Sequence, residues 1–264
     1  MGEKLSKAPV YFTIAQVRFN SVQKMDTFAP DIQEKFRKAT FSDAKNITLT
    51  GLNFGLGVNN APIQFPVPVT QTQHSYSNFE NTKCFILDQS SLTFQSTDYN
   101  GFDSFSKTFL SGLQFVDEVV EGIDFVDRIG MRYLNAFKPQ MGHSLHQYLN
   151  PKVVGLFDDS EKQISHSFSE TVYVRNRKNV IARTVILNGS FNFPLDTQLG
   201  SLVVNKRFVE EISGLHSSLD IDSSTSERQK YSINLVSDEL AKIHAEVENA
   251  FKEIVLPYAL EAWK

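Results

Sequence analysis

Two long stretches of the chain carry apolar residues at helical spacing, and they constrain the fold most. One stripe runs from Phe102 to Val120 and the other from Val236 to Ile254, with an apolar residue at every third or fourth position. Gly122 and Pro257 follow the two stripes and predict where the helices end. Because each helix has one apolar face, each is expected to bury that face against a sheet.

Alternating stretches before and after these helices predict strands. Val10–Phe19 is apolar on both faces, which is typical of a central strand. Further strands are predicted at Phe85–Leu87, Leu92–Gln95, Asp124–Phe137, Phe168–Arg175, Val180–Leu187 and Leu215–Asp222. Hairpins beside one-faced helices predict an α+β fold, with a mostly antiparallel sheet and the two long amphipathic helices packed on it.

The order of elements suggests two related halves. Leu92–Thr97 and Leu219–Thr225 are both strand-like, end in small hydroxyl residues and precede a long helix. We therefore expect an N-terminal α+β half over residues 1–138 and a C-terminal α+β half over residues 139–264, which can form one continuous domain. The alternative is that Ser and Thr cap both helices without any shared origin.

One segment has an unusual composition. The 34 residues from Asn46 to Phe79 contain no Asp, Glu, Lys or Arg but several Gly and Pro. We expect a buried irregular excursion or a flap there, and no long regular strand. Asn188–Leu199 has a similar composition, rich in Gly, Asn and Phe. The two segments could frame a pocket or be plain loops.

Charge and cysteine content limit the class of function. The formal net charge of −4 argues against a protein that depends on bulk attraction to nucleic acid or anionic lipid. The single cysteine, Cys84, excludes a disulfide scaffold and suits a reducing compartment. No apolar stretch is long enough for a bilayer, so we expect a cytoplasmic protein with no membrane partner.

A candidate ligand site lies in the Asp124–Phe137 strand. Strand alternation places Arg128, Gly130 and Arg132 on one face. Two guanidiniums beside a bare glycine can receive a phosphate or carboxylate, because Arg presents a fork of donors and Gly lets a ligand approach the backbone. The alternative is that both arginines pair with acids on neighbouring strands.

A weaker candidate is a metal site on the Leu215–Asp222 strand. His216, Asp220 and Asp222 share one face with Ser218, and a histidine with two carboxylates suits a divalent cation. A solvated strand face has the same polar alternation, so the sequence predicts no metal with any specificity. Phosphate-loop, dinucleotide, hydrolase-elbow and kinase motifs are absent, and no cofactor is expected.

The spacing of several short runs resembles a sporadically distributed, uncharacterised bacterial family of proteins of about 250 residues. The resemblance covers nearly the whole chain and is most distinctive at one run, Arg128-Ile129-Gly130-x-Arg132-Tyr133-x-Asn135. It also includes Leu219-Asp220-Ile221-Asp222. Such a resemblance implies a bacterial cytoplasmic protein with patchy occurrence, as for genes in defence or toxin-linked loci, and supplies no catalytic residues.

Together these patterns predict a non-catalytic binding or interaction protein, with a protein partner or a small anionic ligand. One alternative is an enzyme that acts on a phosphorylated or nucleotide substrate through Arg128, Arg132, Asp220 and Asp222. Another is an RNA-binding protein that uses the sheet, which the net charge of −4 disfavours. Convergence of the four charged residues in an open cleft would favour the enzyme, and a paired network would favour the binding protein. A homo-oligomer is compatible with either.

Overall fold

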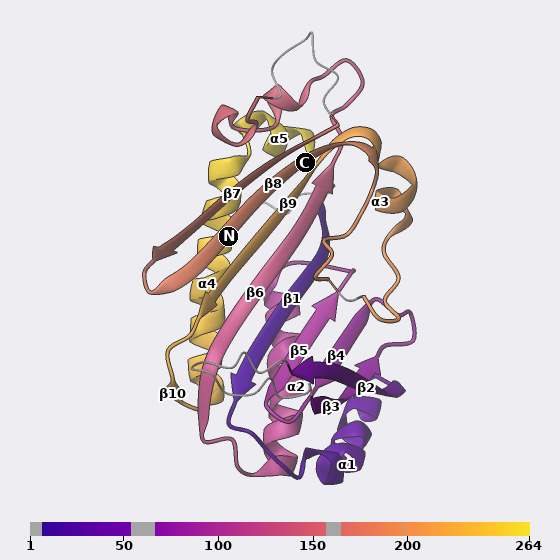
Figure 1. The fold of residues 1–264 in the computed structure, drawn as a ribbon, viewed down its shortest axis with the longest axis vertical. Coiled ribbons are helices and arrows are strands. Elements are labelled where there is room, and N and C mark those ends of the chain that lie inside the picture. Colours follow the sequence, from indigo (N-terminus) through magenta and orange to yellow (C-terminus); the bar gives the residue numbers. More distant parts are fainter. Residues whose placement is uncertain (1–6, 54–66, 157–164, 198) are drawn as a thin grey trace, which may run out of the picture.

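The structure is a computed structural model that describes residues 7–53, 67–156, 165–197 and 199–264. Its centre is one ten-stranded sheet in the order β2-β3-β4-β5-β1-β6-β9-β8-β7, with β10 also paired to β6 (Figure 1). All pairings between named strands are antiparallel, so the predicted α+β class with a mostly antiparallel sheet is confirmed. The strands are β1 (Val10–Phe19), β2 (Asp43–Asn53), β3 (Val67–Ser77), β4 (Lys83–Leu87), β5 (Ser91–Ser96), β6 (Phe125–Phe137), β7 (His166–Arg175), β8 (Lys178–Ser190), β9 (Ser213–Thr225) and β10 (Gln229–Lys230).

Three helices lie behind the sheet as drawn in Figure 1. They are α1 (Met25–Lys38), α2 (Phe102–Val120) and α4 (Ile233–Ile254), of 14, 19 and 22 residues. The sheet is therefore covered by a third helix, α1, besides the two long ones. The shorter helices are two 3-10 helices, η1 (Leu145–Gln147) and η2 (Pro151–Val153), and two α-helices, α3 (Lys206–Glu211) and α5 (Pro257–Ala262).

The main hydrophobic core fills the space between these helices and the sheet. Phe109 and Leu113 of α2 and Ile243 of α4 have no exposed surface. They meet the inward residues of the central strands, such as Val17 and Ile129. Phe251 belongs to the predicted stripe of α4 but is only partly buried, whereas Glu239 and Glu246 are buried, so the buried face of that helix is rotated relative to its apolar pattern.

The two sides of the sheet centre are built in a similar way, with a strand before a long helix next to the central pair on each side. β1 pairs with β6 in the middle. β5, the strand before α2, flanks β1, and β9 flanks β6 with only the short β10 between it and α4. In this arrangement β6 (Phe125–Phe137) is the first strand of the second half. The boundary expected from the sequence, at residue 138, instead assigns β6 to the first half. Hydrogen bonding is continuous across the centre, and a duplication of the chain stays a prediction.

In the uncharged segment Asn46–Phe79, the described residues form regular strands, which the sequence did not predict. β2 and β3 pair over eleven residues each, so the expectation of no long regular strand is wrong for them. Pro68 is tolerated in β3 because β4 pairs only with His74–Ser77, leaving the Pro68 end of β3 without a second neighbour that needs an N–H. Residues 54–66, on which the expected excursion or flap mainly falls, lie outside the described residues.

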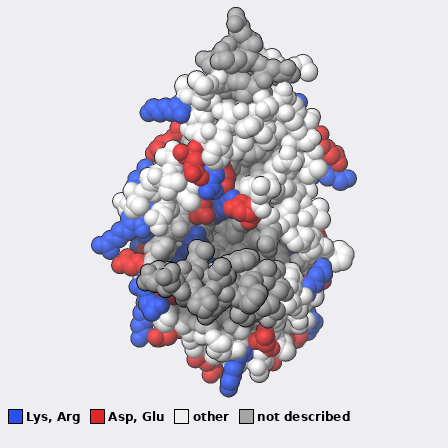
Figure 2. All heavy atoms as spheres, in the orientation of Figure 1, with Lys and Arg blue, Asp and Glu red and all other residues white. Residues whose placement is uncertain are grey.

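The opposite side of the sheet, here called the front face, carries no long helix among the described residues. One part of it is covered by the described residues of the 191–212 segment, which includes α3 (Figure 1). These residues build a second, smaller core with β1, β4 and β6, in which the ring of Tyr11 makes edge contacts with Phe191 and Phe193. The middle of the front face is instead charged, and Figure 2 shows acidic and basic side chains gathered there.

Candidate functional site

The predicted anion site lies in this charged middle of the front face. Arg128 and Arg132 come from β6 and lie across the central strand pair from Arg18 and Ile14 of β1. The predicted shared face of Arg128, Gly130 and Arg132 follows from the regular pairing of this stretch. A β-carbon on Gly130 would lie only 2.9 Å from the terminal nitrogens of Arg128. Gly130 is therefore the position over which the Arg128 guanidinium lies.

Arg132 is fully engaged by two carboxylates. Its Nε and Nη2 donate to the two oxygens of Asp220 at 2.7 Å each. Its Nη1 and Nη2 donate to Asp196 at 2.9 and 3.0 Å. The side chains of Arg132 and Asp220 are 12% and 8% exposed, whereas that of Asp196 is 64% exposed. Arg132 thus joins an inner, buried carboxylate to an outer one carried by the 191–212 segment.

The network extends across the sheet to β7. Arg183 of β8 donates through Nη1 to Asp220 at 3.1 Å and through Nε to Glu170 at 2.6 Å. Two arginines, Arg132 and Arg183, therefore face three carboxylates, and we call these five residues the Arg132 network. Opposite charges lie at hydrogen-bonding distance throughout the network, and no donor fork is left vacant on Arg132.

Arg128 has much poorer partners. Its Nη1 donates to the neutral side-chain amide of Gln16 at 3.1 Å. Its nearest carboxylate is Asp222, with 3.7 Å between Arg128 Nη2 and Asp222 Oδ1. Arg18, directly opposite on β1, is exposed and carries a like charge. The Arg128 corner, meaning Arg18, Arg128 and Asp222, therefore has two positive charges and one negative charge.

The pKa values of Arg132 and Arg128 shift in opposite directions, in line with their different partners. Burial alone would lower the pKa of Arg132, but the hydrogen bonds to Asp220 and Asp196 outweigh burial and raise it. Burial lowers the pKa of Arg128, and Arg18 lowers it further against the opposing effect of Asp222. Burial likewise raises the pKa of Asp222, although Arg128 pulls it down. Among the described residues, the charges of Arg128 and Asp222 are thus incompletely compensated.

The weak metal candidates do not assemble. Asp220 is bound to two arginines, and His216 is fully buried with its Nδ1 at 2.9 Å from the carbonyl of Gly214. The strand carries His216 four residues from Asp220, or about 13 Å along its axis. Within the described ranges, no group of three or more His, Cys, Asp or Glu side chains could hold a metal ion.

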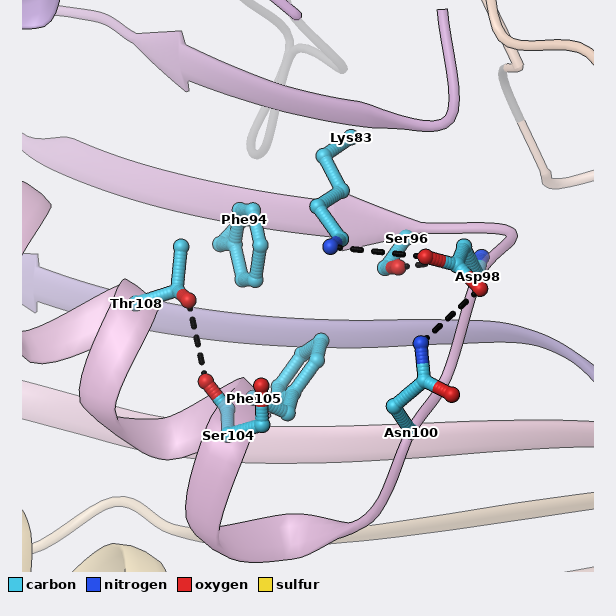
Figure 3. Close-up of a pocket in the computed structure, with 8 residues that line it drawn as sticks. All are labelled: Lys83, Phe94, Ser96, Asp98, Asn100, Ser104, Phe105 and Thr108. Atoms are coloured by element: carbon cyan, nitrogen blue, oxygen red, sulfur yellow. Dashed lines mark hydrogen bonds and ion pairs between the residues drawn. The ribbon is translucent and has the colours of Figure 1, made fainter. Parts of the chain in front are cut away.

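A separate small hollow lies where α2 begins (Figure 3). Lys83 lines one side of the hollow, and its Nζ lies 3.4 Å from Oδ2 of Asp98. Phe94 and Phe105 also line it. Its volume is about 10 Å³, which is room for one water molecule. Because a metabolite needs a pocket of roughly 300 Å³ or more, this hollow is not a substrate site.

Several residues of the charged centre were not expected from the sequence. Asp196, Glu170 and Arg183 complete the Arg132 network, and Gln16 holds Arg128. The one available signal was the Asn188–Leu199 segment, whose composition resembled a pocket frame and which contains Asp196. Arg132 and Asp220 meet as a paired network, which is the alternative in which an arginine of β6 pairs with an acid on the neighbouring strand.

Comparison with known proteins found no protein-family model, curated protein or solved structure that matches the chain. Within the part of the chain that the structure describes, no helix combines the length and the apolar character needed to cross a bilayer.

Proposed function

We propose that this is a non-catalytic binding protein that holds an anionic group, a phosphate or a carboxylate, at the Arg128 corner. The observation that carries the proposal is the unequal treatment of two arginines on one strand face. Arg132 donates four hydrogen bonds to two carboxylates, whereas Arg128 donates one hydrogen bond to a neutral amide. An external anion would supply what Arg128 lacks.

The surroundings of Arg128 support an anion over a cation. Arg18 lies opposite on the neighbouring strand, and two like charges directly across a strand pair repel each other. An anion between them would relieve this repulsion and accept hydrogen bonds from both guanidiniums. Gly130 lets the Arg128 guanidinium lie against the strand backbone, because a β-carbon there would come within 2.9 Å of its terminal nitrogens.

Binding is favoured over catalysis because Asp220, which the enzyme would need, is already paired with arginines. The alternative enzyme needs Asp220 and Asp222 as working carboxylates. Both oxygens of Asp220 accept hydrogen bonds from arginines, so this carboxylate is already engaged within the protein. The proposed setting is the bacterial cytoplasm, in a defence or toxin-linked locus, and it rests on the sequence resemblance alone.

Isothermal titration with inorganic phosphate and with citrate, at constant ionic strength, tests this proposal. We expect saturable binding by the parent protein and at least ten-fold weaker binding by Arg128→Gln, equivalent to about 1.4 kcal/mol. Arg37→Gln is the matched control, because Arg37 is an exposed arginine paired with Glu34 on α1, on the other side of the sheet. Equal binding by all three proteins, or binding by none, would contradict the proposal.

A further inference from the structure

A second surface of the molecule is the free margin of the sheet at β7. β7 is the last strand in the sheet order, and its outer side has no strand partner among the described residues (Figure 1). Its front-face side chains Phe168, Val172 and Val174 are 58%, 63% and 70% exposed. An exposed, ten-residue apolar edge strand is a template for pairing with another strand.

The hairpin turn determines which residues present their backbone outward. Asn176 and Arg177 have φ of 50° and 61° and form a two-residue turn between Arg175 and Lys178. In such a hairpin the flanking pair is a hydrogen-bonded pair, and bonded pairs alternate with non-bonded ones along the ladder. The outward N–H and C=O groups therefore belong to the even-numbered residues, the same residues that carry the apolar front-face side chains.

Natural edge strands are usually protected by charge or proline, and β7 lacks this protection. The strand contains no proline, and Glu170 is its only charged residue between Phe168 and Val174. Arg183 of the same chain donates to Glu170 at 2.6 Å, which neutralises it. The strand is thus left without the unpaired charge that discourages pairing at an edge.

The edge is also held in place. Arg175 Nε lies 2.5 Å from a carboxylate oxygen of Glu246 on α4, and Asn176 donates to the same carboxylate at 2.8 Å. Lys178, at the start of β8, forms a buried ion pair with Glu239 at 2.6 Å. Because α4 fixes the turn end of the hairpin, little conformational entropy is lost when the strand pairs with another.

We propose that β7 binds β7 of a second copy of this chain, antiparallel and centred on Thr171, so that two sheets become continuous. This register places Phe168 opposite Val174 of the partner at both ends, and Thr171 opposite Thr171. All even residues then meet even residues, as the outward backbone groups require.

Neighbouring registers are less favourable. Centring the pair on Glu170 would place two carboxylates directly opposite each other, which is destabilising. Centring it on Val172 would move Phe168 opposite the turn residue Asn176 and lose its apolar partner. Only the Thr171 register pairs both apolar ends and brings no like charges together, and this self-complementarity favours a second copy as the occupant.

Disulfide trapping tests the register. In a non-hydrogen-bonded antiparallel pair the two Cα atoms are about 4.5 Å apart, which suits a disulfide. Thr171→Cys should therefore form a covalent dimer under mild oxidation. Ser169→Cys should not, because the two copies of residue 169 would lie about 13 Å apart. The parent, whose Cys84 is buried, is the background control. Equal trapping at both positions, or none at 171, would overturn the proposal.

Sedimentation velocity over a range of protein concentrations tests the association itself. We expect a reversible dimer in the parent and at least a ten-fold weaker dimer in Val172→Lys, because a lysine on the edge opposes pairing. Val209→Lys is the matched control, since Val209 is a comparably exposed valine on α3. A parent that stays monomeric throughout, or equal weakening by both variants, would overturn the proposal.

Discussion

Arg132 and Arg128 lie four residues apart on the same face of β6, yet their surroundings are opposite in kind. Across the central pair, Arg132 faces the apolar Ile14 and Arg128 faces the like-charged Arg18. On the other side, β9 runs beside Arg132 and brings Asp220 and Asp222, but its pairing with β6 ends at Ile129. Strand register, more than residue type, therefore determines whether a guanidinium is used by the fold or left for a ligand.

The first way to sharpen this comparison is to remove the inner carboxylate of the Arg132 network. Asp220→Asn should lower the free energy of unfolding by about 3 kcal/mol, because two arginines lose a largely buried partner. Urea denaturation at neutral pH measures this change. Asp127→Asn is the control, since Asp127 pairs with Arg228 in the open and should cost less than about 1 kcal/mol. Similar losses for the two variants would show that the network does not stabilise the sheet.

The outer carboxylate should matter less. Asp196 is mostly exposed, so Asp196→Asn should cost about 0.5–1 kcal/mol at neutral pH. Hydrogen bonds from Arg132 lower the pKa of Asp196, so its contribution is complete above about pH 4 and is lost as the pH falls through the lowered value in the folded protein. Unfolding free energies of parent and variant should therefore converge in acid. A constant difference down to low pH would contradict this explanation.

The smallest of these effects should have the opposite sign. Burial raises the pKa of Asp222, so its ionised form costs stability at neutral pH. Asp222→Asn should therefore raise the free energy of unfolding slightly, by less than about 1 kcal/mol. The gain should disappear as the pH falls through the raised pKa to below about 4, where Asp222 is protonated in both states. A clear loss of stability at neutral pH would mean that Asp222 is a firm partner of Arg128.

Local patterns in the sequence were sufficient to place residues on faces. Alternation put Arg128, Gly130 and Arg132 on one side of β6, and Asp220 with Asp222 on one side of β9, as the pairing has them. Helical spacing likewise placed Phe109 and Ile243 in the core. Each of these properties depends on neighbours a few residues away, which is the range over which a sequence pattern carries information.

Partners far apart in the sequence could not be predicted. Asp196 meets Arg132 across 64 residues and Gln16 meets Arg128 across 112 residues, because the sheet order and the path of the 191–212 segment bring them together. β2 and β3 were missed for a related reason. Pro68 argued against a strand, and only the limited pairing of β3 with β4 explains why it is tolerated.

The most direct test compares Arg132→Gln with Arg128→Gln by urea denaturation in buffer without phosphate. The two substitutions remove the same charge from the same face of β6. Arg132→Gln should lower the free energy of unfolding by about 3–5 kcal/mol, because it leaves Asp220 buried without its main partner. Arg128→Gln should change it by no more than about 0.5 kcal/mol. Equal losses for the two variants would show that Arg128 is as structural as Arg132 and would contradict its assignment to ligand binding.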